Sequence, residues 1–154
     1  LVGSEMCIRD RSDAKDFYRD FFPDFNEQSF VKMMEVMNLD INQKISSLSK
    51  GMQEKLNVAL CFSREAKLYV LDEPIGGVDP LARDMILDSI IDRAYDKKTI
   101  IITTQLVRDI ENIFDRCVFL SDGATILSGN AEDIRNERGM SIEETFKEIY
   151  RGQI

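Results

Sequence analysis

One stretch constrains the fold of this chain more than any other: residues 67–80, which read KLYVLDEPIGGVDP. Residues 68–71 are apolar without alternation, a pattern that predicts a strand buried on both faces of a parallel sheet. The proline and the two glycines that follow end the strand. Two adjacent carboxylates, Asp72 and Glu73, are therefore expected at its C-terminal edge.

Open α/β sheets bind their ligands at this carboxyl edge. A nucleotide site needs one carboxylate to hold magnesium there and another to orient or deprotonate the attacking water. We expect Asp72 to be the metal ligand and Glu73 to be the catalytic base. Taken alone, the same pair is equally consistent with a solvated strand end.

A second informative stretch, LSKGMQ at residues 48–53, lies upstream. Apolar residues follow it at helical spacing, and Ser49 is placed to cap the N-terminus of that helix. The apolar positions are Met52, Leu56, Ala59 and Leu60. Free backbone N–H groups and a serine hydroxyl at a helix start form an anion site, although Ser49 by itself is also explained as a simple N-cap.

Together the two stretches resemble the ATP-binding-cassette (ABC) ATPases. LSKGM is similar to the signature motif, LYVLDEP to the Walker B strand with its catalytic glutamate, and IGGVDP to the D-loop. The resemblance runs from about residue 13 to the C-terminus, and the order and spacing of three motifs make it specific. It implies a partial P-loop NTPase fold of the α/β class. That fold is a three-layer sandwich with a mostly parallel sheet flanked by helices, together with part of the ABC helical subdomain.

The resemblance also implies ligands and partners. ATP and Mg²⁺ are the expected cofactors, and the cofactor-binding residues are Ser49, Lys50, Gly51 and Met52 of the signature motif and Asp79 of the D-loop. The expected partners are a second ABC ATPase subunit, identical or different, and a transmembrane permease subunit. The expected location is cytoplasmic, peripheral on the inner face of the cell membrane. Asp79 also reads as the N-cap of the next helix, a structural role that can coexist with a dimer contact.

The β-branched run at residues 98–104 predicts a second buried strand, which would bring Gln105 to the same sheet edge. The family pattern breaks here, because Thr-Thr-His is expected and residues 103–105 are TTQ. A glutamine amide can donate a hydrogen bond to a γ-phosphate oxygen but cannot carry a proton's charge. We therefore expect Gln105 to be a catalytic residue that stabilises the transition state weakly. The signature departs as well, with Lys50 in place of glycine and Met52 in place of glutamine.

Composition excludes several other kinds of site. The chain has no histidine, which excludes Ser-His-Asp triads and His-ligated metals. The net charge of −8, without a Lys/Arg-rich block, argues against nucleic acid as a partner. No apolar run approaches the ~18 residues needed to cross a bilayer. The cysteines Cys7, Cys61 and Cys117 lack CxxC spacing, and we expect the last two to be buried free thiols.

Several further elements are predicted from periodicity and turn chemistry. An amphipathic helix over residues 26–37, capped by Asn26, carries a Phe and Met stripe that is interpreted as core, with docking of a permease segment as the alternative. The other expected elements are a helix at 13–22, a helix beginning at Pro80, a helix at 106–114, a hairpin around Asp122-Gly123, a helix at 131–137 and a last helix with a capping box between Ser141 and Glu144.

Residues 1–11 have no helical or strand period and resemble the translation of a sequencing-library adapter, with an ordinary native terminus as the alternative. We treat residues 1–12 as a non-native or disordered run. One truncated ABC ATPase domain is expected over residues 13–154. Its helical-subdomain part spans 13–48, and the signature helix, Walker B, D-loop, H-loop region and C-terminal elements span 49–154.

No G-x-x-x-x-G-K-[ST] loop occurs in the chain, and the Q-loop and adenine-stacking aromatic have no candidates. The chain therefore resembles the C-terminal portion of an ABC ATPase subunit and is expected to be inactive alone. The expected function is that of the nucleotide-binding subunit of an ABC transporter, in which ATP hydrolysis drives transport through a separate permease. The alternatives are a non-transport ABC ATPase of DNA repair or translation and a catalytically dead dimerisation module.

Overall fold

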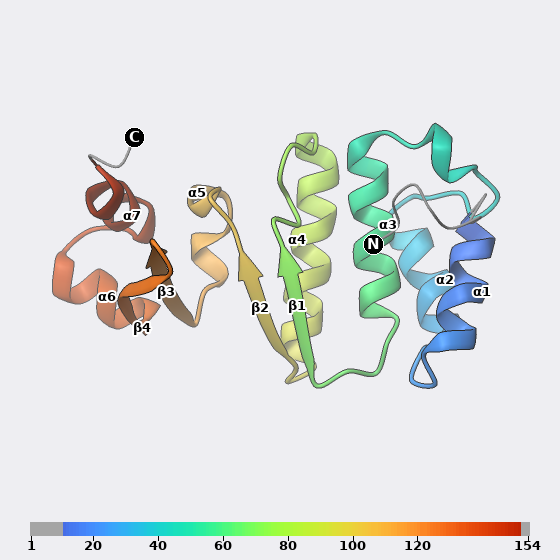
Figure 1. Cartoon of the computed structure of the whole chain (residues 1–154), viewed down its shortest axis with the longest axis horizontal. Coiled ribbons are helices and arrows are strands. Elements are labelled where there is room, and N and C mark those ends of the chain that lie inside the picture. Colours follow the sequence, from blue (N-terminus) through green and yellow to red (C-terminus); the bar gives the residue numbers. More distant parts are fainter. Residues whose placement is uncertain (1–10, 152–154) are drawn as a thin grey trace. The chain divides into compact units, whose positions relative to one another are not determined.

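A computed structural model describes residues 11–151 of the chain (Figure 1). The chain forms two compact units, the first ending at Thr104 and the second beginning at Gln105. The adapter-like run lies outside the described residues up to residue 10, as does Cys7, and Arg11 begins the first helix. The expected division of the domain at residue 48 stays a prediction.

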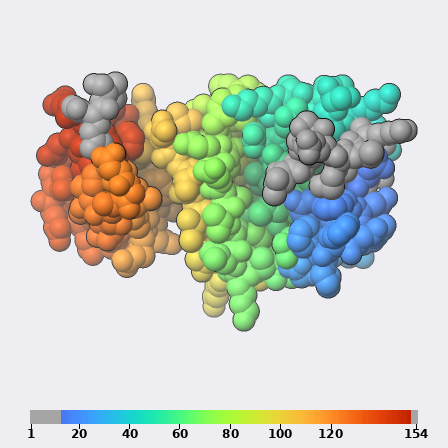
Figure 2. Space-filling model, viewed as in Figure 1, coloured from blue at the N-terminus to red at the C-terminus, as the bar shows by residue number. Residues whose placement is uncertain are grey.

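The first unit begins with three helices and one short 3-10 turn. They are α1 (Arg11–Phe21), α2 (Glu27–Val36), the 3-10 turn η1 (Ile45–Ser47) and α3 (Lys50–Phe62). The Asn26 side chain accepts a 3.0 Å hydrogen bond from the Ser29 N–H, which confirms the predicted cap of α2. Phe30, Met34 and Met37 are buried, which supports the core interpretation of the stripe on this helix. In the space-filling view, the atoms of α1 to α3, blue to green, close against the yellow-green segment that follows (Figure 2).

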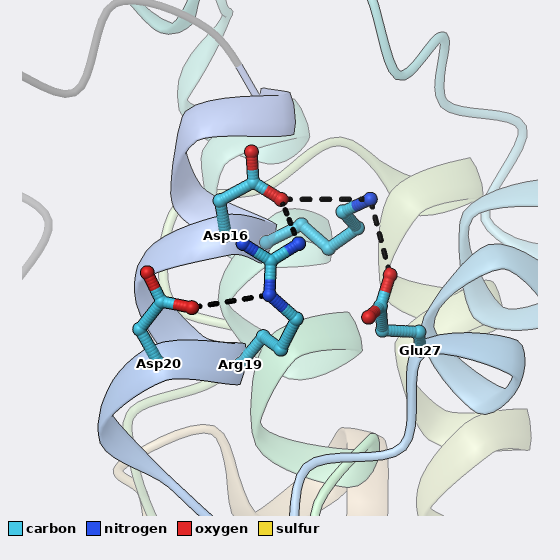
Figure 3. A network of polar contacts seen from close by, with 5 residues as sticks. Asp16, Arg19, Asp20 and Glu27 are labelled. Carbon is cyan, nitrogen blue, oxygen red and sulfur yellow. Dashed lines mark hydrogen bonds and ion pairs between the residues drawn. The ribbon is translucent and has the colours of Figure 1, made fainter.

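A polar network fixes α1 to the start of α2 on the surface of this unit (Figure 3). Lys15 lies 3.2 Å from Glu27 and 3.6 Å from Asp16, and Arg19 contacts both Asp16 and Asp20. Because the acidic side chains and Arg19 are 44–64% exposed, each pair contributes at most about 1 kcal/mol. The Lys15–Glu27 pair links the two helices, and the other contacts lie within α1.

The first unit continues with a parallel β-α-β segment made of β1 (Leu68–Asp72), α4 (Pro80–Tyr95) and β2 (Thr99–Thr103). The two strands pair in parallel, with Leu68 opposite Thr99 and Asp72 opposite Thr103. Helix α4 contacts both α3 and β2. Asp79 accepts a 2.9 Å hydrogen bond from the Ala82 N–H, which confirms its predicted place as the N-cap of α4.

The expectation that both strands are buried on both faces is wrong for this structure. In β1, Tyr69 and Leu71 are buried, whereas Leu68 is 50% and Val70 61% exposed. Ile101 of β2 is 48% exposed. Helices pack against one face of this two-stranded pair, and nothing in the described part of the first unit covers the opposite apolar side chains.

The second unit contains a hairpin and short helices. They are α5 (Val107–Ile110), the 3-10 turn η2 (Glu111–Ile113), β3 (Arg116–Ser121), β4 (Ala124–Asn130), α6 (Ala131–Arg138) and α7 (Ile142–Tyr150). The single helix expected over residues 106–114 is wrong, because it ends after one turn and continues as 3-10. The Glu111 carbonyl there accepts a hydrogen bond from the Arg135 guanidinium.

The hairpin is confirmed as an antiparallel pair. Asp122 and Gly123 both have positive φ, 49° and 76°, as a tight two-residue turn requires. Cys117 and Phe119 of β3 pack with Ile134 of α6 and Ile142 of α7 in the core of this unit. The predicted capping box of α7 is also present, with Ser141 and Glu144 bonding each other's backbone N–H groups.

Candidate functional site

The two carboxylates expected at the sheet edge lie at the C-terminal end of β1. Asp72 is the last residue of the strand, is exposed, and faces Thr103 in the parallel register. The Thr103 hydroxyl donates a hydrogen bond to Oδ1 of Asp72. This bond occupies one oxygen of the carboxylate and fixes the rotamer that the side chain adopts.

Glu73 follows with an unusual backbone. Its φ is +45°, in the left-handed region, where a residue other than glycine is disfavoured by about 1–2 kcal/mol. Three hydrogen bonds hold it there. Its N–H donates to the Thr103 carbonyl at 2.9 Å, its carbonyl accepts from the Gly76 N–H at 2.9 Å, and its Oε2 accepts from the Thr104 hydroxyl at 3.1 Å.

The loop after Glu73 is anchored by apolar side chains. Pro74 and Ile75 are buried, Ile75 completely, and Val78 is 7% exposed. Gly77 has a φ of +69°, which favours glycine. The half-buried Glu73 therefore lies between a fixed strand end and a fixed loop.

The first turns of α3 and α4 lie against this loop. The Ser49 hydroxyl accepts a 3.2 Å hydrogen bond from the Met52 N–H, as predicted for an N-cap. A Cβ atom on Gly51 would lie 2.9 Å from Oδ2 of Asp79, and one on Gly77 would lie 2.6 Å from Nζ of Lys50. The signature-like residues are thus packed on the D-loop-like residues.

Figure 1 shows how these groups share one side of the first unit: the ends of β1 and β2 and the first turns of α3 and α4 all face the same way. Lys50 and Ser49 are exposed and Met52 is half-buried. Gln105 is also exposed, but it begins the second unit. Seven of the eight predicted site residues thus lie in the first unit. Their roles stay predictions.

A magnesium ion at this edge would need phosphate oxygens of a bound nucleotide, and water, as additional ligands. Among residues 11–151 no cluster of three or more Asp, Glu, Cys or His side chains could hold a metal ion. Mg²⁺ is commonly bound by one or two carboxylates together with substrate phosphates and water. Asp72, exposed at the end of β1, suits that arrangement as the single protein carboxylate.

The thiols do not contribute a nucleophile. Cys61 is half-buried at the end of α3 and Cys117 is buried in β3, and both are free. Burial raises the pKa of both thiols, so the reactive thiolate is rare at neutral pH. The expectation of a buried free thiol is confirmed for Cys117, whereas Cys61 is free but only half-buried.

Two functional candidates escaped the sequence reasoning, which assigned no role to Thr103 or Thr104. Each hydroxyl bonds one of the two adjacent carboxylates. The available signal was a pair of threonines at the end of one predicted parallel strand and a pair of carboxylates at the end of the other. Residues at the carboxyl ends of neighbouring parallel strands meet at one edge.

Comparison with known proteins gives a consistent result. The ABC transporter family model matches residues 15–76. The chain is 35% identical over 113 residues to the Nod factor export ATP-binding protein I of Rhizobium etli, covering 72% of this chain and 36% of that protein. It is 33% identical over 112 residues to the energy-coupling factor transporter ATP-binding protein EcfA2 of Clostridium acetobutylicum, covering 69% of this chain and 39% of that protein. The chain thus spans little more than a third of the length of either relative.

Solved structures share the fold. An ATP-binding subunit of an ABC transporter superposes with a TM-score of 0.78 at 23% identity, covering 96% of this chain and 64% of that one. The ADP conformation of MJ1267, an ATP-binding cassette of an ABC transporter, gives a TM-score of 0.64 at 25% identity and covers 88% of this chain and 54% of that one. The mixed helix and strand architecture is therefore a partial α/β fold of the P-loop NTPase type, as predicted.

Proposed function

The chain belongs to the ABC transporter family of ATP-binding proteins, and from that premise we propose that a protein containing it hydrolyses ATP to drive transport through a separate membrane permease. The observation that supports this most is the pair of carboxylates at the end of β1, each hydrogen-bonded by one threonine hydroxyl from the end of β2. Carboxylates that merely face solvent at a strand end do not need a hydroxyl donor each. Two carboxylates with different catalytic roles would each need to be held in place.

In this proposal Asp72 holds Mg²⁺, which when bound neutralises charge on the β- and γ-phosphates. Glu73 acts as the general base. One proton of the attacking water passes to the Glu73 carboxylate as the water oxygen bonds the γ-phosphorus and the bond to the ADP oxygen breaks. The fixed backbone around Glu73 keeps the base in place for that step.

The exposed first turn of α3 is proposed to meet ATP bound on a second ABC ATPase subunit. The exposed Ser49 and Lys50 present a hydroxyl and an ammonium group at the helix start, which suit a phosphate, and the buried Gly51 follows them. Met52 and Asp79 would flank the same contact. Lys50 packs against Gly77, which lies in the loop that follows Glu73. A nucleotide that contacts Lys50 would therefore also affect the position of this loop.

A permease partner and a position on the inner face of the cell membrane follow from the family rather than from a feature of this surface. No helix among residues 11–151 is long and apolar enough to cross a membrane. We propose the separate permease subunit on the strength of the family alone.

The test is Mg²⁺-dependent phosphate release by a complete subunit that carries this chain, with and without its permease. Asp72→Asn should abolish the activity, whereas Asp84→Asn on the exposed side of α4 removes the same charge and should leave it intact. Equal activity of both variants would contradict the assigned metal site. A complete subunit that binds ATP and dimerises without turnover would favour the dimerisation module, which the glutamine at position 105 also suits.

A further inference from the structure

The two ends of the parallel strand pair match each other residue by residue. Asp72 lies opposite Thr103 in the register, and the next residues, Glu73 and Thr104, form the next pair of contacts. Each hydroxyl donates to one carboxylate, Thr103 to Asp72 and Thr104 to Glu73. The two candidate catalytic groups therefore have separate supports on one neighbouring strand.

We propose that Thr104 is a positioning residue for Glu73, holding its Oε2 so that the carboxylate meets the attacking water in one orientation. This inference rests on the proposed function, because it assumes that Glu73 is the base. Thr104 would act only through Glu73 and would not touch the nucleotide.

The backbone explains why such a support is needed. A glutamate has three side-chain torsions, and Glu73 also leaves the strand at a φ of +45°, which turns its side chain away from the regular strand direction. The loop after it lies beside the carboxylate, since a Cβ atom on Gly76 would lie 3.7 Å from Oε2 of Glu73. The 3.1 Å bond from the Thr104 hydroxyl gives the same oxygen a defined donor.

Threonine is well suited to this task. A β-branched side chain has few χ1 states, so its hydroxyl is held in place by its own backbone. That backbone is fixed in turn, since the Glu73 N–H donates to the carbonyl of Thr103, the residue before it. Donor and acceptor are thus preorganised at the same strand ends, and preorganised hydrogen bonds are the ones that lower barriers.

The experiment uses a complete subunit carrying this chain. Thr104→Val keeps the shape of the side chain and removes the hydroxyl, and it should lower kcat about tenfold with little change in KM for ATP, as expected for loss of a hydrogen bond to a charged group. Thr104→Ser restores the hydroxyl and should recover most of the rate. Thr99→Val, an exposed position at the other end of β2, is the matched control and should behave as the parent.

A second readout does not depend on turnover. Carbodiimide labelling of carboxylates, followed by mass spectrometry, should show faster modification of Glu73 in Thr104→Val than in the parent, with the exposed Asp88 as an internal reference. Unchanged labelling together with an unchanged kcat would overturn the inference. If Thr104→Val fails to fold, Thr104→Ala removes the same hydroxyl without adding bulk and is judged by the same two measurements.

Different results would contradict the proposed function and the role of Thr104. A parent protein without Mg²⁺-dependent ATPase activity would overturn the proposed function. A parent that is active, and is inactivated by Glu73→Gln but untouched by Thr104→Val, would overturn the role of Thr104 alone. A fall in rate that Thr104→Ser does not recover would assign Thr104 to packing rather than to its hydroxyl.

Discussion

Gly51 and Asp79 are in contact where the first turns of α3 and α4 meet, since a Cβ atom on Gly51 would lie 2.9 Å from Oδ2 of Asp79. Oδ1 of the same carboxylate accepts the Ala82 N–H and caps α4. Asp79 therefore serves two purposes at once. It closes the N-terminus of one helix and sets how closely the other helix can approach.

This contact predicts the effect of Gly51→Ala on stability. An alanine in a helix is normally favoured over glycine by roughly 0.5–1 kcal/mol. Here its methyl group would push Asp79 away from Ala82, and losing an N-cap costs about 1 kcal/mol or more. We expect Gly51→Ala to lower the free energy of unfolding slightly in the parent chain, as measured by urea denaturation.

The matched control is the same change in an Asp79→Ala background. The obstructing carboxylate is absent there, so Gly51→Ala should become stabilising by the helix-propensity difference of roughly 0.5–1 kcal/mol. An effect of Gly51→Ala that is equal in both backgrounds would mean that Gly51 and Asp79 do not interact.

Glu73→Gln should abolish ATP turnover in a complete subunit while leaving ATP binding intact. The amide keeps the shape of the side chain but cannot accept the proton from water, so an ATP-bound dimer should accumulate. Phosphate release, nucleotide binding and size-exclusion chromatography with ATP and Mg²⁺ measure the three properties. Retained turnover would place the base at another residue, and Asp79 is the next carboxylate to test.

Glu144 gives a prediction about pH. Its carboxylate accepts the Ser141 backbone N–H at 2.9 Å, and this hydrogen bond holds the pKa of Glu144 below its usual range. A lowered pKa in the folded state means that the ionised carboxylate stabilises the fold above the unfolded pKa of about 4.3, and that this contribution is lost as the pH falls further.

Glu144→Gln should therefore lower the melting temperature at pH 7, and the difference from the parent should shrink as the pH falls through the lowered pKa. Glu137→Gln, at an exposed position on α6, removes the same charge and separates a general charge effect from the capping box. A deficit of Glu144→Gln that stays constant from pH 7 to acid would show that ionisation does not contribute.

Local features were the most predictable from the sequence. The N-caps Asn26, Ser49, Asp79 and Ser141 all accept the backbone N–H expected of them, because capping depends only on residues within one turn. The parallel strand pair and the hairpin at Asp122-Gly123 were predicted for a related reason. Their apolar runs and turn residues lie within short windows of sequence.

Features that depend on register or on packing between elements were not predictable. No sequence signal indicates that Glu73 adopts a positive φ. The paired strand ends bring Thr104 near Glu73, but the direction of its hydroxyl toward Oε2 depends on the register of the two strands. The contact between Gly51 and Asp79 requires the distance between two helices. The helix expected at 106–114 ends after one turn, and the 3-10 turn that follows begins at Glu111, whose carbonyl accepts from Arg135, far away in the sequence.

The last prediction concerns Gln105, where the resemblance to the family leads one to expect histidine. If this side chain faces the γ-phosphate in a complete subunit, Gln105→His should raise the rate of ATP hydrolysis, because an imidazole can donate a stronger, partly charged hydrogen bond as negative charge develops. Replacing a neutral bond by a charge-assisted one is worth about 1 kcal/mol, or roughly a fivefold to tenfold gain. The gain should grow as the pH falls toward ~6.5, where more of the imidazole is protonated.

Steady-state phosphate release by the parent and by Gln105→His, measured between pH 6 and 8, tests this, and Gln105→Asn is the matched control. Asparagine keeps the amide but shortens the side chain, so it should lower the rate if the amide of Gln105 contacts the phosphate. An unchanged rate for Gln105→His at every pH would mean either that residue 105 does not face the γ-phosphate or that chemistry is not rate-limiting. Single-turnover kinetics separate these two cases, because they report the chemical step before product release. A single-turnover rate that is also unchanged would remove Gln105 from the catalytic site.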